Sequence, residues 1–350
     1  MNTTTMQAAV TTRWGKLELQ SLAIPEPGPG QVRVRTTLAG ICGSDLHIFQ
    51  GHHPTAVSPI VQGHEFVGIV DAVGPDVPDE GETQVGRRVV VEPLISCGQC
   101  EACRRGLVHV CRKLKLLGIH EAGAFGEYFL APAKKVIAVP DGLADALAAL
   151  TEPFAVGMHV CRQGGVQTGD RALVVGAGPI GLIVAMVAQT AGAEVAVSEI
   201  SEARLKQAAA FGFATIDARQ DAAEQARERT DGDGFDVVFE VSGSEPGVAL
   251  AIEAARVRGR LVQVGFFGKP PVADLFKLTL KELSLVGSRV YTEEDFRRTV
   301  RLLEQIVEKK RFDLEQLISG QTDLAGLEAA IGRMLAGEVS GKILVQPSNA

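Results

Sequence analysis

The stretch Arg171-Ala-Leu-Val-Val-Gly-Ala-Gly-Pro-Ile-Gly181 decides the fold of this chain. Its apolar residues 172–175 predict a buried strand, and the G-x-G-x-x-G spacing that follows opens a long apolar helical run. The first glycine allows a tight turn, the second lets backbone approach a pyrophosphate, and the third lets helix and strand pack closely. The helix start then offers unpaired N–H groups to the phosphates. The predicted cofactor-binding residues of this turn are Gly176, Gly178, Pro179, Ile180 and Gly181.

A second apolar strand, residues 194–198, ends in Glu199, where a ribose-binding carboxylate is expected. Such a carboxylate accepts hydrogen bonds from both ribose hydroxyls and repels a 2′-phosphate. It therefore favours NAD over NADP. The alternative is a solvated carboxylate that caps the helix starting near Ser201. Arg204, one turn further on, flanks the adenine or pairs with Glu199, and it leaves some room for NADP.

Between residues 156 and 290 apolar strands alternate with helices, which predicts a doubly wound parallel sheet, an α/β Rossmann domain. Ser242, Val264 and Gly265 lie at the carboxyl ends of the fourth and fifth strands, which border the cofactor crevice, and the family resemblance described below implies that they bind cofactor. Ordinary strand-to-loop glycines would give the same pattern. The six strands are expected near 171–175, 194–198, 213–216, 235–240, 260–264 and 283–286.

The bulk composition excludes several classes of protein. A chain of 350 residues with 46% hydrophobic content has room for two globular domains. A formal charge of −7 argues against general affinity for nucleic acid or anionic membranes. No apolar run is long enough to span a membrane, and the first residues do not resemble a signal peptide, so a soluble cytoplasmic protein is expected.

Four of the six cysteines are crowded into one short segment, with the spacing Cys97-x2-Cys100-x2-Cys103-x7-Cys111. Four thiolates suit a closed tetrahedral structural zinc. Ferredoxins share the first spacing but continue with x3-C-P, which disfavours an iron–sulfur cluster. The acidic chain disfavours a DNA-reading zinc finger.

Residues 6–38 alternate as short strands, which predicts an antiparallel β domain at the start of the chain. A polar turn follows in Gly40–His47 and carries a thiol, a hydroxyl and an imidazole. The segment Gly63–Gly74 then places His64 and Glu65 immediately before a strand. These side chains are candidates for a reactive site.

The Cys42-Gly-Ser-Asp turn and the Gly63-His-Glu-x-x-Gly strand, in this order, resemble the zinc-containing medium-chain dehydrogenases. The resemblance implies a GroES-like antiparallel β catalytic domain and a Rossmann domain that binds NAD. It places the catalytic domain at 1–155 and 291–350 and the Rossmann domain at 156–290. Within the last part, helices at 292–309 and 323–336 and a strand at 342–345 return to the catalytic domain.

The resemblance also implies a second, catalytic zinc beside the structural one. Cys42 and His64 are its strongest ligands, and Glu65 and Glu152 complete the shell directly or through water. Glu152-Pro153 is typical of the polyol (sorbitol) and threonine dehydrogenase branches, whereas classical alcohol dehydrogenases have a cysteine there. Zinc with an open position lowers the pKa of an alcohol that binds to it, which assists hydride transfer to nicotinamide.

The remaining site residues come from the same resemblance. Ser44 passes the released proton, through the cofactor ribose, to His47. Arg289 reaches toward the substrate and would grip a carboxylate or several hydroxyls. His52 and His53 match no role and are expected to be loop residues, and a homotetramer is expected.

Three functions remain open at this stage. The favoured one is NAD-linked oxidation of a secondary alcohol in a polyol, sugar alcohol or sugar acid, with threonine 3-dehydrogenase-like oxidation of an amino alcohol as its alternative. The second is a zinc-free reductase of the same superfamily. The third is a sensor that binds dinucleotide without turnover.

Overall fold

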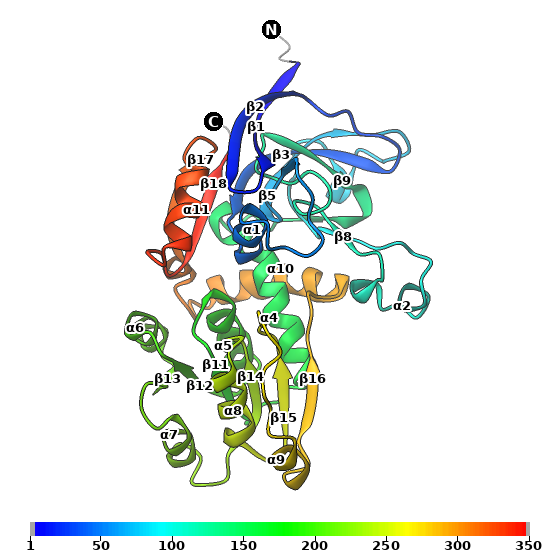
Figure 1. Ribbon diagram of the computed structural model, residues 1–350. Coiled ribbons are helices and arrows are strands. Elements are labelled where there is room, and N and C mark those ends of the chain that lie inside the picture. Colours follow the sequence, from blue (N-terminus) through cyan, green and yellow to red (C-terminus); the bar gives the residue numbers. More distant parts are fainter. Residues whose placement is uncertain (1–3, 348–350) are drawn as a thin grey trace. The chain divides into compact units, whose positions relative to one another are not determined.

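The computed structural model describes residues 4–347, and the chain forms two compact units (Figure 1). Unit 1 comprises Met1–Glu152 and Thr292–Ala350, and unit 2 comprises Pro153–Tyr291. The chain therefore leaves the first unit once and returns to it.

Unit 2 is built on one parallel sheet in the order β13-β12-β11-β14-β15-β16. Connections on both sides of β11 make the order reverse there, which is the doubly wound pattern. The prediction of an α/β Rossmann domain is confirmed. The strands are β11 Arg171–Val175, β12 Glu194–Glu199, β13 Ala214–Asp217, β14 Phe235–Glu240, β15 Ala255–Gln263 and β16 Ser284–Gly287.

Helices cover both faces of this sheet because successive strand residues point to opposite sides. Leu173 and Val175 of β11 belong to a core that includes Val248 of α8. Val174 points the other way, toward Gly181 of α5. The helices are α4 Thr151–Gln163, which begins in unit 1, α5 Pro179–Thr190, α6 Glu202–Ala210, α7 Ala222–Glu228, α8 Glu245–Ala254 and α9 Leu275–Leu280.

Unit 1 contains a larger sheet, β10-β6-β5-β3-β18-β17 with β9 also paired to β3, and a smaller sheet, β2-β1-β4. A short pair, β7–β8, closes the base of the cysteine segment. The first strands are β1 Thr5–Arg13, β2 Lys16–Ala23, β3 Gln31–Gly40, β4 Ile60–Val61, β5 Glu65–Val73 and β6 Arg88–Val91. The others are β7 Leu94–Ile95, β8 Lys115–Leu116, β9 Tyr128–Pro132, β10 Val136–Ala138, β17 Ile318–Asp323 and β18 Lys342–Gln346.

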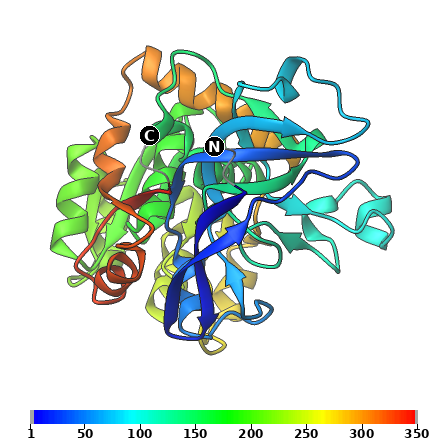
Figure 2. The ribbon, with the colours of Figure 1, turned by 90° about the horizontal axis from the view of Figure 1, so that it is seen from above.

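The last part of the chain completes this unit. Strand β18 pairs antiparallel with β3, so the end of the chain enters the core formed by its beginning. The β1–β2 hairpin lies beside α11, where Leu17 N donates to Glu328 Oε2 at 2.9 Å (Figure 2). The helices are α1 Gly43–Phe49, α2 Glu101–Arg104, α3 Asp145–Ala148, α10 Glu293–Glu308 and α11 Leu327–Leu335, with short 3-10 turns at Gly81–Thr83, Val108–Val110, Ala133–Lys135 and Leu314–Leu317.

Two local predictions are wrong. The expected polar turn after residue 42 is the helix α1, because Cys42 and Asp45 form a capping box that starts it. The helix expected at 323–336 begins only at Leu327, because Asp323 ends the edge strand β17, which is parallel to β18, and a turn over residues 324–326 precedes the helix. None of the helices within residues 4–347 is long and apolar enough to cross a membrane.

Candidate active site

The cysteine segment of unit 1 brings its four sulfurs to one point. All four lie within 4.8 Å of one another, and three of the pairs are 3.5, 3.9 and 4.0 Å apart. Four sulfurs held at about 2.3 Å from one tetrahedral zinc would lie about 3.8 Å apart. The arrangement therefore fits a zinc ion without rearrangement.

Backbone N–H groups of this segment point at the sulfurs. Cys97 N and Lys113 N both donate to Cys111 Sγ at 3.3 Å. Backbone N–H groups of Arg112 and Cys103 lower the pKa of Cys100 to about 6. Donors that stabilise thiolates are what a metal site of this kind requires, since the thiolate is the ligand.

A second cluster lies where β3 ends and β5 begins. Cys42 is the N-cap of α1, directly after β3, and Glu65 is the first residue of β5. The register of the two strands pairs Gly40 with Glu65, and a Cβ at Gly40 would lie 2.5 Å from Glu65 Oε2. Any side chain at position 40 would therefore displace the carboxylate of this glutamate. The pairing brings the two sequence motifs side by side.

Donor atoms of Cys42, His64 and Glu65 lie within 4.8 Å of one another. His64 and Glu65 are buried, and His64 Nδ1 and Glu65 Oε2 have no hydrogen-bond partner within residues 4–347. Burial alone would lower the pKa of His64, but negative charge on Asp45 and Cys42 raises it well above its ordinary value. The cluster therefore combines negative charge with buried ligand atoms that have no hydrogen-bond partner. This combination fits a divalent cation.

Asp45 supports this cluster from α1. Its Oδ2 accepts from Cys42 N at 2.9 Å, and its Oδ1 lies 3.7 Å from His64 Nδ1. The side chain is fully buried, and burial raises its pKa. Asp45 thus binds the backbone of one ligand and places negative charge beside the ring of the other.

The structure adds a residue that sequence reasoning missed. Lys342, the first residue of β18, forms a buried ion pair with Glu65 Oε1. Burial opposes its charge, but the charge of Glu65 raises the pKa of Lys342 above its ordinary value. Oε1 of Glu65 is thus paired with Lys342, and Oε2 remains available as a metal ligand. The only signal in the sequence is a lysine at the head of an apolar strand.

We expect Lys342→Met to destabilise the fold by about 3–5 kcal/mol, because it leaves Glu65 as a buried charge without its partner. Urea unfolding measures the change. The double variant Lys342→Met/Glu65→Gln should recover most of the loss, since it buries no net charge. Equal losses in the single and double variants would contradict this account of the pair.

The other predicted residues lie around the cluster. Glu152, at the start of α4, is buried and outside the 4.8 Å group, although its charge acts on both His64 and Lys342. Ser44 Oγ lies 3.9 Å from Cys42 Sγ. His47 follows one turn later on α1 and is exposed.

In unit 2 the glycine turn has the geometry expected of a phosphate-binding loop. Gly176 has φ +103°, and a Cβ there would lie 3.0 Å from Ser242 backbone. A Cβ at Gly181 would collide with the carbonyl oxygen of Gly176. Gly178 is the N-cap of α5, with Pro179 and Ile180 in its first turn, and the space beside its Cα is open. The N–H groups at the start of α5 can therefore meet an anion.

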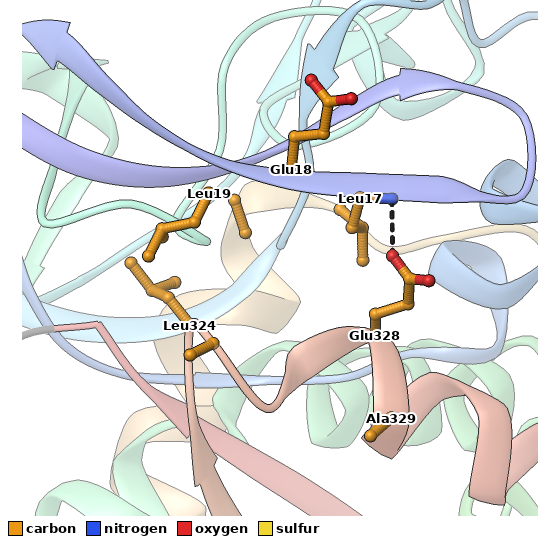
Figure 3. Close-up of a pocket in the computed structure, with 8 residues that line it drawn as sticks. Leu17, Glu18, Leu19, Leu324, Glu328 and Ala329 are labelled. Atoms are coloured by element: carbon orange, nitrogen blue, oxygen red, sulfur yellow. Dashed lines mark hydrogen bonds between the residues drawn. The ribbon is translucent and has the colours of Figure 1, made fainter.

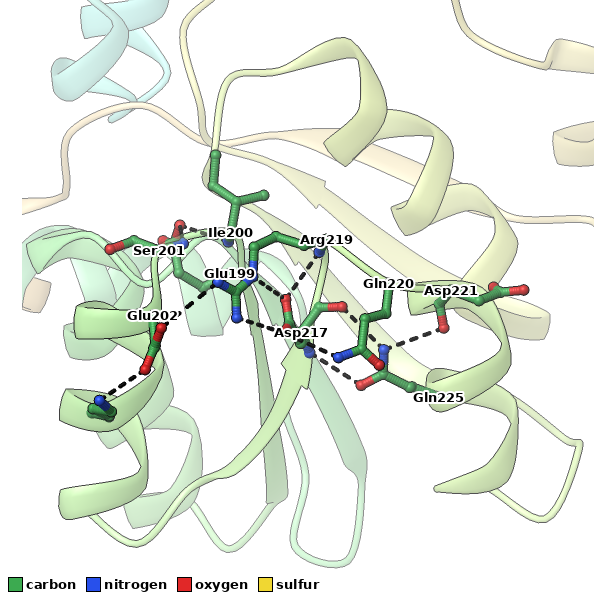
Figure 4. Close-up of polar contacts among 10 residues, drawn as sticks. Glu199, Ile200, Ser201, Glu202, Asp217, Arg219, Gln220, Asp221 and Gln225 are labelled. Carbon is green, nitrogen blue, oxygen red and sulfur yellow. Dashed lines mark hydrogen bonds and ion pairs between the residues drawn. The ribbon is translucent and has the colours of Figure 1, made fainter.

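Glu199 ends β12 beside this turn and is bound by backbone groups (Figure 4). Its Oε2 accepts from Ala177 N at 2.8 Å, and its Oε1 accepts from Ser201 N at 2.9 Å. Arg204 Nη1 lies 3.7 Å from Glu199 Oε2, the pairing that the sequence left open. The nearby Arg219 is bound to Asp217, whose pKa its hydrogen bonds lower to about 2.

The carboxyl ends of β14 and β15 are held together by Glu240, which sequence reasoning also missed. Its buried carboxylate accepts from Ser242 Oγ and, at 2.6 Å, from Gln263 Nε2. Its backbone oxygen accepts from Val264 N and Gly265 N at 2.9 Å. Glu240 thus holds in place the predicted cofactor-binding residues at both strand ends. Arg289 follows β16 and is exposed.

A groove of about 490 Å³ also lies in unit 1, between β2 and the start of α11 (Figure 3). Leu17, Leu19 and Leu324 line it, and Glu328 is bound to the β2 backbone there. It contains none of the predicted ligands or relay residues. The metal-binding clusters, and not this groove, therefore mark the reactive site.

A cluster of one half-buried thiol, a buried imidazole and a buried carboxylate in unit 1, together with a dinucleotide-binding sheet in unit 2, defines the class of protein. It is a metal-dependent oxidoreductase that uses a dinucleotide. Comparison with known families agrees: residues 28–141 match the alcohol dehydrogenase GroES-like domain, and residues 179–305 match the zinc-binding dehydrogenase domain. The chain belongs to the zinc-binding dehydrogenases of the medium-chain superfamily, and it is an enzyme of the alcohol dehydrogenase type.

Two relatives are named for sugar-derived substrates. A 2-dehydro-3-deoxy-L-galactonate 5-dehydrogenase of Pseudoalteromonas atlantica is 38% identical over 91% of this chain and 92% of its own length. A sorbitol dehydrogenase of Halalkalibacterium halodurans is 36% identical over 98% of this chain and 99% of its own.

Solved structures share the whole fold. A zinc-binding dehydrogenase from Sinorhizobium meliloti bound to NADP and an alcohol dehydrogenase from Escherichia coli bound to NADH are 30% and 32% identical. Each has a TM-score of 0.89 and covers 98% of this chain and 99% of its own. The family thus uses both forms of nicotinamide cofactor.

Proposed function

We propose that this protein oxidises a secondary alcohol of a polyol or sugar acid with NAD as hydride acceptor, and that each chain binds two zinc ions. The observation that carries the proposal is the convergence of the half-buried Cys42 with the buried His64 and Glu65. Zinc bound there would supply a Lewis acid that lowers the pKa of the substrate alcohol, and NAD would accept the hydride. The four-cysteine cluster is proposed to hold the structural ion.

The chain's own residues have distinct proposed roles. Cys42, His64 and Glu65 hold the metal, and Glu152 is proposed to complete the shell directly or through water. Ser44 lies beside Cys42, three residues before His47 on α1, so both side chains lie on one face of the helix. Ser44 would accept the substrate proton as its own hydroxyl proton passes, through the cofactor ribose, to His47, and the exposed His47 would then release a proton to solvent.

The proposed substrate class rests on the carboxylate-rich ligand shell and on the two named relatives. The test is NADH formation with alditols, aldonates and threonine, before and after removal of metal by chelation. Metal-dependent turnover of alditols or aldonates is expected. Preference for threonine would favour the amino-alcohol alternative, and zinc-loaded protein inactive on all of them would favour a sensor.

NAD is the proposed cofactor because Glu199 places negative charge at the predicted ribose position and Arg204 is paired with it. We expect Glu199→Gln to raise kcat/KM for NADP about tenfold and to lower it for NAD, since the repulsion of a 2′-phosphate is removed. Gln still accepts one of the backbone N–H groups. Initial rates with both cofactors measure the ratio, and an unchanged ratio would exclude Glu199 as its determinant.

The expected homotetramer also remains a proposal. Unit 2 exposes apolar side chains on α9 and on its edge strand β16: Leu275, Phe276, Leu280 and Leu285 are each more than half exposed. A second copy of this chain could cover them and pair with the edge strand. Sedimentation equilibrium that found only monomer would exclude it.

A further inference from the structure

The loop after α1 carries a histidine to which the proposed mechanism gives no role. His53 lies six residues beyond His47 in sequence, and the neighbouring His52 N donates to His47 O at 2.8 Å. This bond ties the loop to the helix that begins at Cys42. The position of His53 is therefore set by an element that carries a metal ligand.

A second loop with a histidine is anchored to the other metal ligand. His120 lies in the turn after β8, and this turn packs against the backbone just before His64. Ala124 N donates to Gly63 O at 3.0 Å, and a Cβ at Gly118 or Gly123 would collide with the same oxygen. The two loops meet, with the rings of His53 and His120 6.3 Å apart between centroids and nearly perpendicular.

The hydrogen-bond network assigns the protons of both rings. His53 Nδ1 accepts from Ala56 N at 3.1 Å and Thr55 N at 3.4 Å, so the neutral ring carries its proton on Nε2. His120 Nδ1 accepts from Leu116 N at 3.1 Å, so its Nε2 donates to Thr55 Oγ1 at 2.9 Å. The hydroxyl of Thr55 then keeps its own hydrogen for a further acceptor.

Two donors on one short loop are thus available: the Nε2–H of His53 and the hydroxyl of Thr55. No residue in 4–347 pairs with Nε2 of His53. Burial lowers the pKa of His53, and positive charge on His120, His47 or His64 would lower it further. The ring therefore stays neutral and donating near pH 7. The bond from His52 N to His47 O and the bond from Ala124 N to Gly63 O place the two loops beside the elements that carry Cys42 and His64.

Two such hydrogen-bond donors match a ligand group that only accepts hydrogen bonds. A carboxylate has two acceptor oxygens and no hydrogen to donate, whereas a hydroxyl needs an acceptor as well for its own hydrogen. We propose that His53 and Thr55, held in place by His120, form a subsite for the carboxylate of a sugar acid whose alcohol carbon reacts at the Cys42–His64–Glu65 cluster. The proposal rests on the proposed function and narrows its substrate class to aldonates.

The test compares two substrates that differ only at the subsite end, a six-carbon aldonate and the alditol of the same configuration. We expect His53→Ala to lower the ratio of kcat/KM for aldonate to kcat/KM for alditol about 10- to 100-fold, mainly through KM, because a hydrogen bond to a charged group is lost. His53→Gln, which keeps a side-chain N–H, should recover part of this ratio. The matched control is His52→Ala, an exposed neighbour for which the ratio should not change.

The outcomes separate this inference from the proposed function. Wild-type protein without metal-dependent turnover of any alcohol would contradict the proposed function itself. With turnover established, an unchanged ratio in His53→Ala would overturn the subsite. The subsite would also be overturned if Arg289→Gln, and not His53→Ala, removed the preference for aldonate.

Discussion

Replacing Cys42 by Ser should lower kcat roughly a thousandfold or more while NADH still binds, since a Lewis acid supplies several kcal/mol and each 1.36 kcal/mol is tenfold in rate. Serine is a poor zinc ligand because its hydroxyl stays protonated. The fold should survive, because the bond from the backbone N–H at position 42 to Asp45 does not involve the thiol. Steady-state rates, NADH fluorescence titration and zinc analysis measure the three quantities.

Cys161→Ser is the matched control for this variant. Cys161 is a buried cysteine of α4 whose Sγ lies 3.5 Å from Val184 O, and it belongs to neither metal-binding cluster. Its replacement should leave kcat and zinc content unchanged. Full activity in Cys42→Ser, or loss of NADH binding together with activity, would refute a catalytic metal at Cys42.

Cys103→Ser should act on stability and not directly on chemistry. The segment from residue 97 to 111 is mostly exposed, so the four sulfurs and their ion must supply most of its folding energy. Structural zinc contributes about 10–16 kcal/mol in zinc-finger peptides, which sets the scale of the loss. We expect low soluble yield, rapid proteolysis within this segment and one zinc fewer per chain in the soluble fraction.

The control for Cys103→Ser is Arg105→Ser, an exposed position in the same segment that is predicted to leave yield and zinc content unchanged. The soluble fraction of Cys103→Ser should retain the zinc at Cys42. If Cys42→Ser and Cys103→Ser each removed both ions and unfolded the chain equally, the separation into catalytic and structural metals would be wrong.

The features predicted best from sequence depend on residues close together in the chain. The glycine turn needs only a strand, three glycines and a helix in succession, and the doubly wound sheet around it is confirmed. The four cysteines lie within 15 positions, so their spacing predicts a cluster that the structure brings together. Local pattern is sufficient where the interaction itself is local.

The features that sequence reasoning missed depend on contacts that the fold alone creates. Lys342 meets Glu65 across 277 positions, and Glu240 meets Gln263 across adjacent strands. Neither pairing leaves a periodic signal. The start of α1 was missed for a different reason: Cys is an unusual N-cap, and the capping box with Asp45 becomes visible only in the backbone geometry.

The central claim is that one chain holds two separate zinc ions, one enclosed by thiolates and one left open for substrate. Anomalous diffraction at the zinc edge from crystals of the purified protein tests it most directly. We predict two peaks per chain, one among Cys97, Cys100, Cys103 and Cys111 and the other among Cys42, His64 and Glu65. A single peak at the four cysteines, with none beside Cys42, would contradict the account.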